Sequence, residues 1–283
     1  MIRFVLENRK NLFCAIGVFV SCFMAMSQKT IGHAILKCSY SYTYLKDTVN
    51  KIKEDDLLIL LIGIENSKCY SYYSFQCDSL NSTPDGNKVW NELFRKAIEK
   101  DGANATDFPH KRMRTYVYKN YPTTGRMTIT DGISLQDYIY EDTLNTQSWQ
   151  LTSDTKELLG YMCQKAECDF RGRHWTAWFS PDIPINDGPW KLGGLPGLIL
   201  EAYDRGTQQH FLTIGLQKVV DVPIILSPPS IGKFEKTNRL DFLRTEKRYL
   251  IDMGGHIQME TGINLIDNQP VKVLQYDLIE RDY

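Results

Sequence analysis

Residues 36–44 read LKCSYSYTY, and this stretch points most clearly to the fold class. Its apolar and aromatic side chains, at every second position, are Leu36, Cys38, Tyr40, Tyr42 and Tyr44. A period of two is the pattern of a β-strand, in which successive side chains point to opposite faces of a sheet. Residues 57–64 (LLILLIGI) form a continuous apolar run, which is typical of a strand covered on both faces.

Similar alternation, interrupted by turn signals such as Asp131-Gly132, predicts further strands along the chain. We expect them at residues 68–77, 113–119, 125–131, 134–141, 156–168, 172–180, 197–204, 208–217 and 271–279. Residues 85–99 and 237–251 instead each carry one apolar stripe at helical spacing, which predicts two helices. Many antiparallel strands with two covering helices indicate an α+β domain, mainly antiparallel β, built on a curved sheet.

The first 27 residues have the pattern of a secretory signal peptide. Its basic leader contains Arg3, Arg9 and Lys10. The apolar stretch that follows (12–26) is shorter than the roughly 20 residues of a membrane-spanning helix. Small residues before Gln28 place the predicted cleavage there, so we expect a periplasmic or secreted protein of the cell envelope. An uncleaved membrane anchor and a lipid-modified Cys22 are the alternatives, and lipidation ranks below simple cleavage.

The composition argues against nucleic acid as a partner and indicates a single domain. Removal of residues 1–27 takes three of the 33 basic and one of the 34 acidic residues, which leaves 30 against 33. Because this chain has no positive bias, nucleic acid is not an expected partner. No Pro-, Gly- or Ser-rich linker divides residues 28–283, so we expect one domain there.

Five cysteines follow the predicted cleavage point: Cys38, Cys69, Cys77, Cys163 and Cys168. Export leads to an oxidising compartment, so some of them are expected to pair, although an odd number leaves one over. If 156–168 is one strand, the Cα atoms of Cys163 and Cys168 are roughly 16 Å apart, whereas a disulfide needs about 7 Å or less. We therefore expect disulfides between different strands, such as Cys38 with Cys69 or Cys77.

Residues 188–204 form a glycine-rich segment that reads GPWKLGGLPGLILEAYD. Its motif loop consists of Gly193, Gly194, Leu195, Pro196 and Gly197. Proline fixes φ and glycine accepts a positive φ, so Pro196–Gly197 is predicted to form the centre of a type II turn before a buried strand. The loop precedes a strand, not a helix, and lacks a Lys-Ser/Thr pair, which argues against phosphate binding.

The string GGLPGLI, preceded by GPW, resembles the signature of the GLPGLI family, which is known mainly from Bacteroidota. Upstream segments in the family's order extend the resemblance: LGYMCQKA (159–166), FRGR (170–173), WTAWF (175–179) and DIPI (182–185). The resemblance implies a secreted or periplasmic protein of uncharacterised function whose gene accompanies TonB-dependent outer-membrane systems. It also implies a fold similar to bowl-like half-barrels, such as the extra N-terminal domain of some peptide:N-glycosidases and the periplasmic lipoprotein carriers. It supplies no catalytic residue.

The histidines have no metal-binding spacing and GxSxG is absent, so we expect no catalytic residue, no metal, no cofactor and no enzyme. The candidate ligand-binding residues lie in the segments that carry the resemblance and are Arg171, Arg173, His174, Trp175, Trp178 and Trp190. The two arginines either grip a carboxylate or sulfate, or fix the loop of Asp182 or Asp187, and we favour the second interpretation.

The supply of 16 Tyr and 5 Trp suits a curved sheet that binds a glycan or an amphiphile, although the same rings can simply fill the core, which we favour. The leading hypothesis is a non-enzymatic accessory protein that binds a lipid, a glycan or a protein partner in TonB-dependent outer-membrane transport. The alternatives are a structural factor that docks on an outer-membrane receptor without a ligand, and a hydrolase with an unrecognised site. Candidate O-glycosylation sites, in Asp-Ser/Thr-apolar motifs at predicted strand ends, are Thr48, Ser79 and Thr143.

Overall fold

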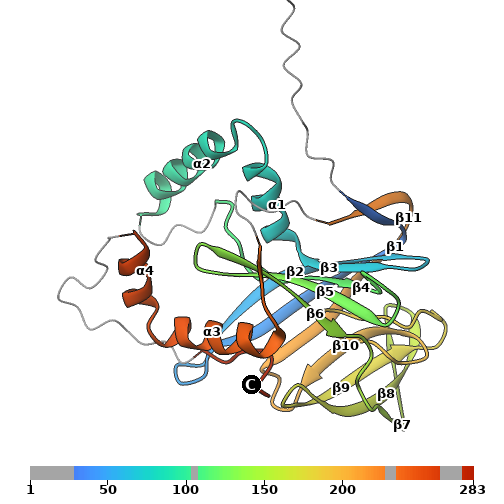
Figure 1. Cartoon of the computed structure of the whole chain (residues 1–283). Coiled ribbons are helices and arrows are strands. Elements are labelled where there is room, and N and C mark those ends of the chain that lie inside the picture. The colour runs from blue at the N-terminus through green and yellow to red at the C-terminus, as the bar shows by residue number, and fades with distance from the viewer. Residues whose placement is uncertain (1–28, 103–107, 227–233, 262–275) are drawn as a thin grey trace, which may run out of the picture.

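The computed structural model describes residues 29–102, 108–226, 234–261 and 276–283. The predicted signal peptide (1–27), its cleavage before Gln28 and the alternative lipid site at Cys22 lie outside these residues. The described residues form a curved, mainly antiparallel sheet with helices beside it (Figure 1), which confirms the predicted α+β class.

Twelve strands of the described chain join in one sheet, in the order β12-β6-β5-β4-β3-β2-β1-β11-β10-β9-β8-β7. Their bounds are β1 (Thr30–Asp47), β2 (Ile52–Gly63), β3 (Ser67–Ser71), β4 (Tyr116–Lys119), β5 (Arg126–Ile133), β6 (Gln136–Thr143), β7 (Gln150–Leu158), β8 (Tyr161–Phe170), β9 (Arg173–Ser180), β10 (Leu198–Asp204), β11 (Gln209–Ile225) and β12 (Glu235–Lys236). Only β12 runs parallel to its neighbour, β6. The sheet is open, because β12 and β7 form two separate edges.

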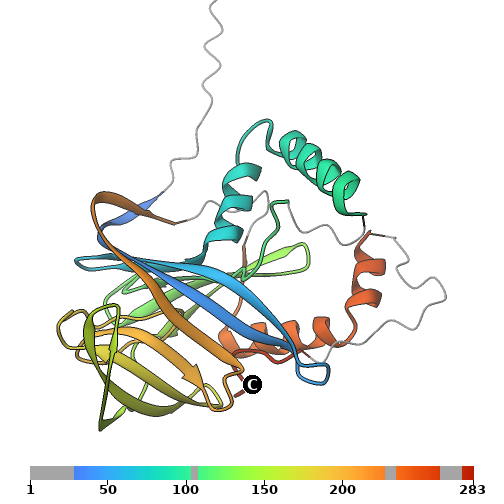
Figure 2. The ribbon, with the colours of Figure 1, turned by 180° about the vertical axis from the view of Figure 1, so that it is seen from behind.

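The long central strands β1 and β11 carry much of the curvature. Their ladder shifts register between Ala34 and Leu36, and again between Ser39 and Tyr40. Such bulges bend a strand and increase its twist. The sheet therefore wraps into a half-barrel (Figures 1 and 2), in agreement with the bowl-like shape that was predicted.

Four helices accompany the sheet in the described chain: α1 (Tyr72–Asn81), α2 (Gly86–Asp101), α3 (Arg239–Ile251) and α4 (Met253–Thr261). The helices predicted at 85–99 and 237–251 correspond to α2 and α3. Helix α3 contacts β5 and β6 and buries Phe242 and Leu243 in the core. Helix α2 packs on α1 and not on the sheet, and its apolar side chains Val89 and Leu93 stay 41% and 37% exposed.

Residues 68–77 are a strand only in their first half. Strand β3 ends at Ser71, whose hydroxyl accepts a hydrogen bond from the backbone N–H of Ser74 (3.2 Å). This contact caps α1, because the serine oxygen satisfies one of the free N–H groups at the start of the helix. The prediction of a strand through to residue 77 is wrong, since the alternating tyrosines continue into a capped helix.

The predicted strand 156–168 is two strands. The chain reverses at Leu159 and Gly160, which have φ values of 50° and 80°. Two successive positive φ values suit the tight turn of a β-hairpin, here between β7 and β8. The strand predicted at 271–279 lies mostly outside the described residues, and residues 276–279 are not in a strand.

The five cysteines of the described chain are all buried and unbonded. Cys163 and Cys168 lie in the same strand, β8, so the separation argued from the sequence holds. Cys38 and Cys69 face each other across β2, because both are paired with Leu60 of that strand. Strands are about 4.8 Å apart, so these two cysteines are roughly 9.6 Å apart, too far for a disulfide.

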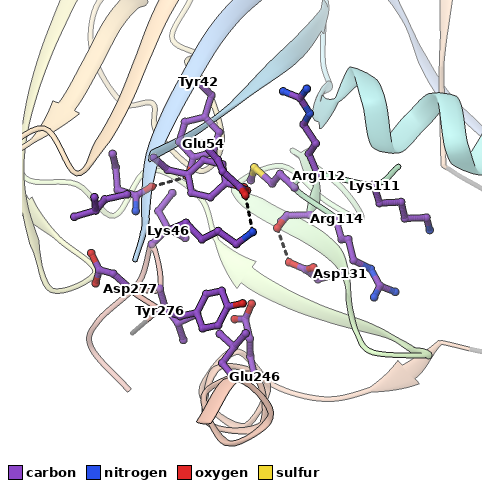
Figure 3. Close-up of a pocket in the computed structure, with 18 of the residues that line it drawn as sticks. Tyr42, Lys46, Glu54, Lys111, Arg112, Arg114, Asp131, Glu246, Tyr276 and Asp277 are labelled. Carbon is purple, nitrogen blue, oxygen red and sulfur yellow. Dashed lines mark hydrogen bonds and ion pairs between the residues drawn. The ribbon is translucent and has the colours of Figure 1, made fainter. Parts of the chain in front are cut away.

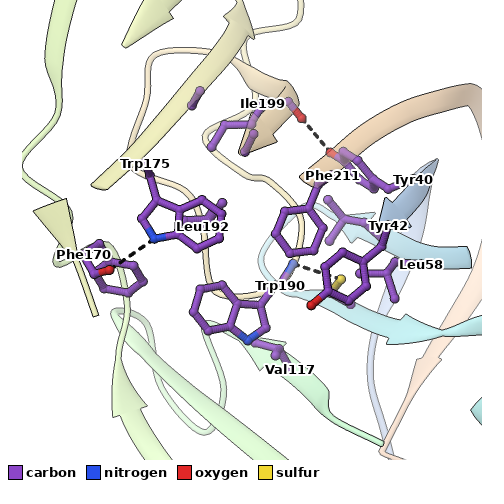
Figure 4. Packing of buried hydrophobic residues seen from close by; sticks show 14 of the residues in the cluster. Tyr40, Tyr42, Leu58, Val117, Phe170, Trp175, Trp190, Leu192, Ile199 and Phe211 are labelled. Atoms are coloured by element: carbon purple, nitrogen blue, oxygen red, sulfur yellow. Dashed lines mark hydrogen bonds between the residues drawn. The ribbon is translucent and has the colours of Figure 1, made fainter. Parts of the chain in front are cut away.

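The concave side of the sheet is filled over one half by the loop between β9 and β10. This loop inserts Trp190, Leu192 and Leu195, which are all at most 1% exposed. The ring of Trp190 lies 6.0 Å from that of Trp175, which in turn lies 6.0 Å from Phe211 (Figure 4). These rings fill the interior of the half-barrel, which leaves the other half of the concave side for a cavity.

A buried lysine fixes this loop to the sheet. The Lys119 ammonium of β4 donates hydrogen bonds to the Asp187 carboxylate (2.6 Å) and to the carbonyls of Gly188 and Leu192 (both 2.7 Å). Each of the three donors of the ammonium therefore has a partner, which offsets the cost of burying the charge.

Candidate functional site

A cavity of about 750 Å³ opens where β1, β2 and β5 face α3 and the C-terminal segment 276–279 (Figure 3). Its wall combines three tyrosines with carboxyl and basic groups from elements far apart in the sequence. The tyrosines are Tyr42, Tyr44 and Tyr276. The acidic residues are Glu54, Asp55, Asp131, Glu246 and Asp277, and the basic ones include Lys46, Lys111, Arg112 and Arg114.

Asp131 reaches the cavity because of the alternation of β5. Met127 and Ile129 of this strand are buried in the core, so Asp131, two positions further, points to the same concave face. Its carboxylate accepts hydrogen bonds from the Thr115 hydroxyl (2.5 Å) and the Gly132 backbone N–H (2.7 Å). Burial raises the pKa of Asp131, although these hydrogen bonds and the charge of Arg114 favour its ionised form.

Glu246 faces Asp131 from the opposite wall. It follows the buried Phe242 and Leu243 by four and three residues, so it lies on the inward face of α3. Figure 3 shows its carboxyl group directed into the cavity beside Tyr276. Burial, together with the negative charges of Asp131 and Glu280, raises the pKa of Glu246 to about 8. No described residue donates a hydrogen bond to this carboxyl group.

A second cavity of about 440 Å³ adjoins the first. The two share four lining residues, which are Arg114, Gly132, Glu246 and Leu250. Glu246 therefore lines both cavities.

The rim formed by β1 and β2 holds a carboxylate whose pKa is shifted in the opposite direction, that of Glu54. Glu54 accepts hydrogen bonds from the Tyr44 hydroxyl (2.7 Å) and the Lys46 ammonium (2.5 Å). Burial acts to raise the pKa of Glu54, but the hydrogen bonds from Lys46 and Tyr44 outweigh it, and the pKa is lowered. Arg112 binds Asp55 (2.6 Å) at the same rim, with its guanidinium 4.0 Å from the centre of the Tyr73 ring.

The predicted binding residues Arg171 and Arg173 hold the C-terminal segment. Arg171 binds both oxygens of Asp142 (2.7 Å each). Arg173, whose side chain is 0% exposed, binds Asp204 (2.5 Å) and Asp277 (2.7 Å). It also donates to the carbonyls of residues 278 and 279. Neither arginine contacts Asp182 or Asp187, so the loop-fixing interpretation named the wrong partner segment.

The other four predicted residues are not brought together at one place. Trp175 and Trp190 are in the core, and the ammonium of Lys156 lies 4.4 Å from the centre of the Trp178 ring. His174 lies 2.8 Å from Asp169 and lines a separate cavity of about 330 Å³. None of the six predicted residues lines the 750 Å³ cavity among the described residues.

The glycines of the motif loop adopt backbone conformations that differ from the predicted ones. The positive φ falls at Gly194 (88°) and not at Gly197, so the predicted type II turn at Pro196–Gly197 is wrong. Gly197 is required for another reason: a Cβ atom there would lie 2.2 Å from the carbonyl oxygen of Ser180. Leu195 is buried in the core between them, so the loop packs against the sheet and does not line the cavity.

The three O-glycosylation candidates occupy different settings. Thr48 is in the turn after β1, and Thr143 is the exposed last residue of β6. Ser79 is exposed on α1 and not at a strand end, because residues 72–81 are helical. No group of three or more His, Cys, Asp or Glu residues in the described chain has a metal-binding arrangement. No helix in the described ranges is long and apolar enough to cross a membrane.

An open antiparallel half-barrel with a polar cavity is thus the class of protein that the fold and the cavity define. The family model for the N-terminal domain of peptide N-glycanase matches residues 71–242, more than half of the 283 residues, and the chain belongs to this family.

The solved structures that are similar to this chain include two of PNGF-II. The structure of PNGF-II in the P21 space group has a TM-score of 0.48 at 14% identity, covering 75% of this chain and 33% of that one. The structure of PNGF-II in the C2 space group has a TM-score of 0.46 at 13% identity, covering 75% and 32%. The chain thus spans about a third of the length of these proteins. The comparison with curated proteins gave no match.

This family membership corrects three predictions. The resemblance to the GLPGLI family was wrong, because the family that matches is the N-glycanase one. The role in TonB-dependent transport, which rested on that resemblance, is wrong for the same reason. The prediction of a non-enzymatic protein is also contradicted, because the matching family is a domain of an enzyme.

Proposed function

We propose that the cavity binds the carbohydrate of N-linked glycopeptides and that the chain acts in the hydrolytic processing of such glycans. The observation that carries this proposal is the 750 Å³ cavity, whose wall combines tyrosine rings with many charged hydrogen-bonding groups. Membership of the N-glycanase family supports a glycan as the ligand class. The proposal replaces the transport role expected from the sequence.

The groups on the wall suit a sugar. A sugar ring presents hydroxyls that both donate and accept hydrogen bonds, and carboxylates and guanidinium groups provide the matching acceptors and donors. Arg112 and Glu54 offer both kinds at one rim. Tyr44 and Tyr276 add ring faces against which the apolar C–H face of a sugar packs. A volume in the range of 300–1,000 Å³ is typical of small-molecule sites.

A periplasmic or secreted location is part of the proposal. It is supported by the signal-peptide pattern of residues 1–27. Residues 28–283 are proposed to act as one domain in that compartment. A glycan-directed role fits this location, because glycoproteins outside the cell present their glycans there.

Calorimetric titration tests the ligand class. The full chain is titrated with an N-glycopeptide and with the same peptide without sugar. We expect binding of the glycopeptide only, and roughly fivefold weaker binding by Tyr276→Ala, because an aromatic contact contributes about 1 kcal/mol. Tyr72→Ala, which removes an exposed ring outside the cavity, is the matched control and leaves the affinity unchanged. Equal binding of both peptides would overturn the proposed function.

A further inference from the structure

The second cavity, of about 440 Å³, has a more apolar wall than the first. Its apolar and aromatic side chains are Ile133, Leu135, Tyr249 and Leu250. Tyr249 and Leu250 follow Glu246 on α3 by three and four residues, so they share its face of the helix. Leu135, in the turn between β5 and β6, is 77% exposed, so this aliphatic side chain is accessible to a ligand.

Two polar side chains of the same wall already have partners within the chain. Arg114 donates hydrogen bonds to the carbonyl of Ser134 (2.6 Å) and to the Asp137 carboxylate (3.0 Å). The Ser134 hydroxyl donates to the carboxylate of Glu260 in α4. Because these polar groups are satisfied, the surface that the second cavity offers to a ligand is mainly the apolar one.

The two cavities follow one another along β5. Asp131 lines the first and Ile133 the second, while Gly132 between them lines both. Strand β5 pairs with β6 without a register shift here, so the side chains of Asp131 and Ile133 share one face and are roughly 6.6 Å apart along the strand. Side chains two positions apart in an extended peptide have the same spacing and the same direction. A peptide that lies extended beside β5 can therefore place one side chain in each cavity.

We infer that the second cavity binds an apolar side chain two positions before the glycosylated asparagine of the glycopeptide, while the first cavity binds the sugar. In an N-glycosylation motif the residue two positions after the asparagine is Ser or Thr, so an apolar side chain at this spacing precedes the asparagine. This inference rests on the proposed function, because it takes an N-glycopeptide as the ligand of the first cavity. It adds the part of the peptide that is recognised and the surface that recognises it.

Calorimetric titration of the full chain with three N-glycopeptides tests the inference. The peptides carry the same glycan and differ only in sequence: one has leucine two positions before the asparagine, one has serine there, and one has the leucine directly before the asparagine. We expect the first peptide to bind roughly tenfold more tightly than the other two, because it alone buries a leucine side chain in the second cavity. The leucine of the third peptide points to the opposite face of an extended chain.

A substitution on the wall of the second cavity separates its contribution from that of the first. Leu135→Ser is expected to weaken binding of the first peptide roughly fivefold and to leave the other two affinities unchanged. The exposure of Leu135 makes this change compatible with the fold. Val220→Ser, which changes an exposed aliphatic side chain on β11 outside both cavities, is the matched control and alters none of the three affinities.

Equal affinity for the three peptides would overturn the inference, as would a loss in Leu135→Ser that is the same for all of them. Both results leave the proposed function standing, whereas absence of binding by all three glycopeptides would remove both. Octyl glucoside tests a lipid chain as the occupant of the second cavity. Tighter binding of octyl glucoside than of the first peptide, weakened by Leu135→Ser, would also overturn the inference.

Discussion

Glu54 and Glu246 line the same cavity, yet their environments move their pKa values in opposite directions. Glu54 accepts hydrogen bonds from Tyr44 and Lys46, which stabilise its charge. Glu246 lacks such donors among the described residues and lies near the negative charges of Asp131 and Glu280. The difference arises from the partners of each group and not from the residue type.

The raised pKa of Glu246 makes the stability of the fold depend on pH. This carboxyl group titrates near 8 in the folded chain and near its ordinary 4.5 in the unfolded chain. Between these values the folded state holds one more proton, so stability falls as the pH rises through this window. We expect wild type to lose about 3–4 kcal/mol relative to Glu246→Gln between about pH 5 and about pH 8. Urea unfolding at a series of pH values measures the difference.

Glu157→Gln serves as the control for this pH series, because Glu157 is exposed on β7. Its stability is expected to follow that of wild type at every pH. Parallel curves for wild type and Glu246→Gln would show that the Glu246 carboxyl group is ionised in the folded chain at neutral pH.

At the scale of elements, the C-terminal segment forms one wall of the cavity. Residues 276–279 line it, and a set of ion pairs ties the segment to the sheet. Arg173 binds Asp277, Lys191 binds Glu280 (2.5 Å), and Arg239 of α3 binds Glu280 (2.6 Å). The shape of the cavity therefore depends on charges that lie outside it.

Arg173→Met tests this dependence. It leaves Asp204 without the guanidinium that it binds and Asp277 with Arg281 alone, and the loss of one member of a buried ion pair costs about 3–5 kcal/mol. Hydrogen exchange followed by mass spectrometry is expected to show faster exchange at 276–283 than in the central strands. Arg205→Met, at an exposed neighbouring position, is the control and leaves exchange unchanged. Unaltered protection of 276–283 in Arg173→Met would mean that the ion pairs do not hold the segment.

The sequence predicted most elements but missed transitions between them. Period-two alternation identified the long strands, because burial of one face imposes it. The same alternation overran Ser71, where a helix cap ends β3, and Gly160, where a hairpin reverses the chain. Serine is a common helix cap and glycine a common turn residue, so both signals are present in the sequence. The alternating tyrosines of 68–77 and the apolar positions on either side of residue 160 nevertheless favoured continuous strands.

At the scale of the whole molecule, the curved sheet was predictable and the cavity was not. Alternation and turn signals indicate a curved antiparallel sheet even when the order of the strands in the sheet is unknown. The cavity depends on which elements lie next to each other in the fold, because Asp131 and Glu246 are 115 residues apart in the sequence. Neither lies in a motif, and their pairing arises only once α3 covers β5. The arginines and tryptophans of the motif segments, which the sequence predicted as binding residues, instead hold the C-terminal segment and the core.

The central claim is that the cavity between β5 and α3 binds the carbohydrate of a glycopeptide. A crystal structure of the full chain with an N-glycopeptide bound tests it most directly. We expect sugar density between Asp131 and Glu246, with a ring packed on Tyr276 and hydroxyls within hydrogen-bonding distance of Arg112 or Glu54. Sugar density at another surface of the chain, with this cavity unchanged, would contradict the claim.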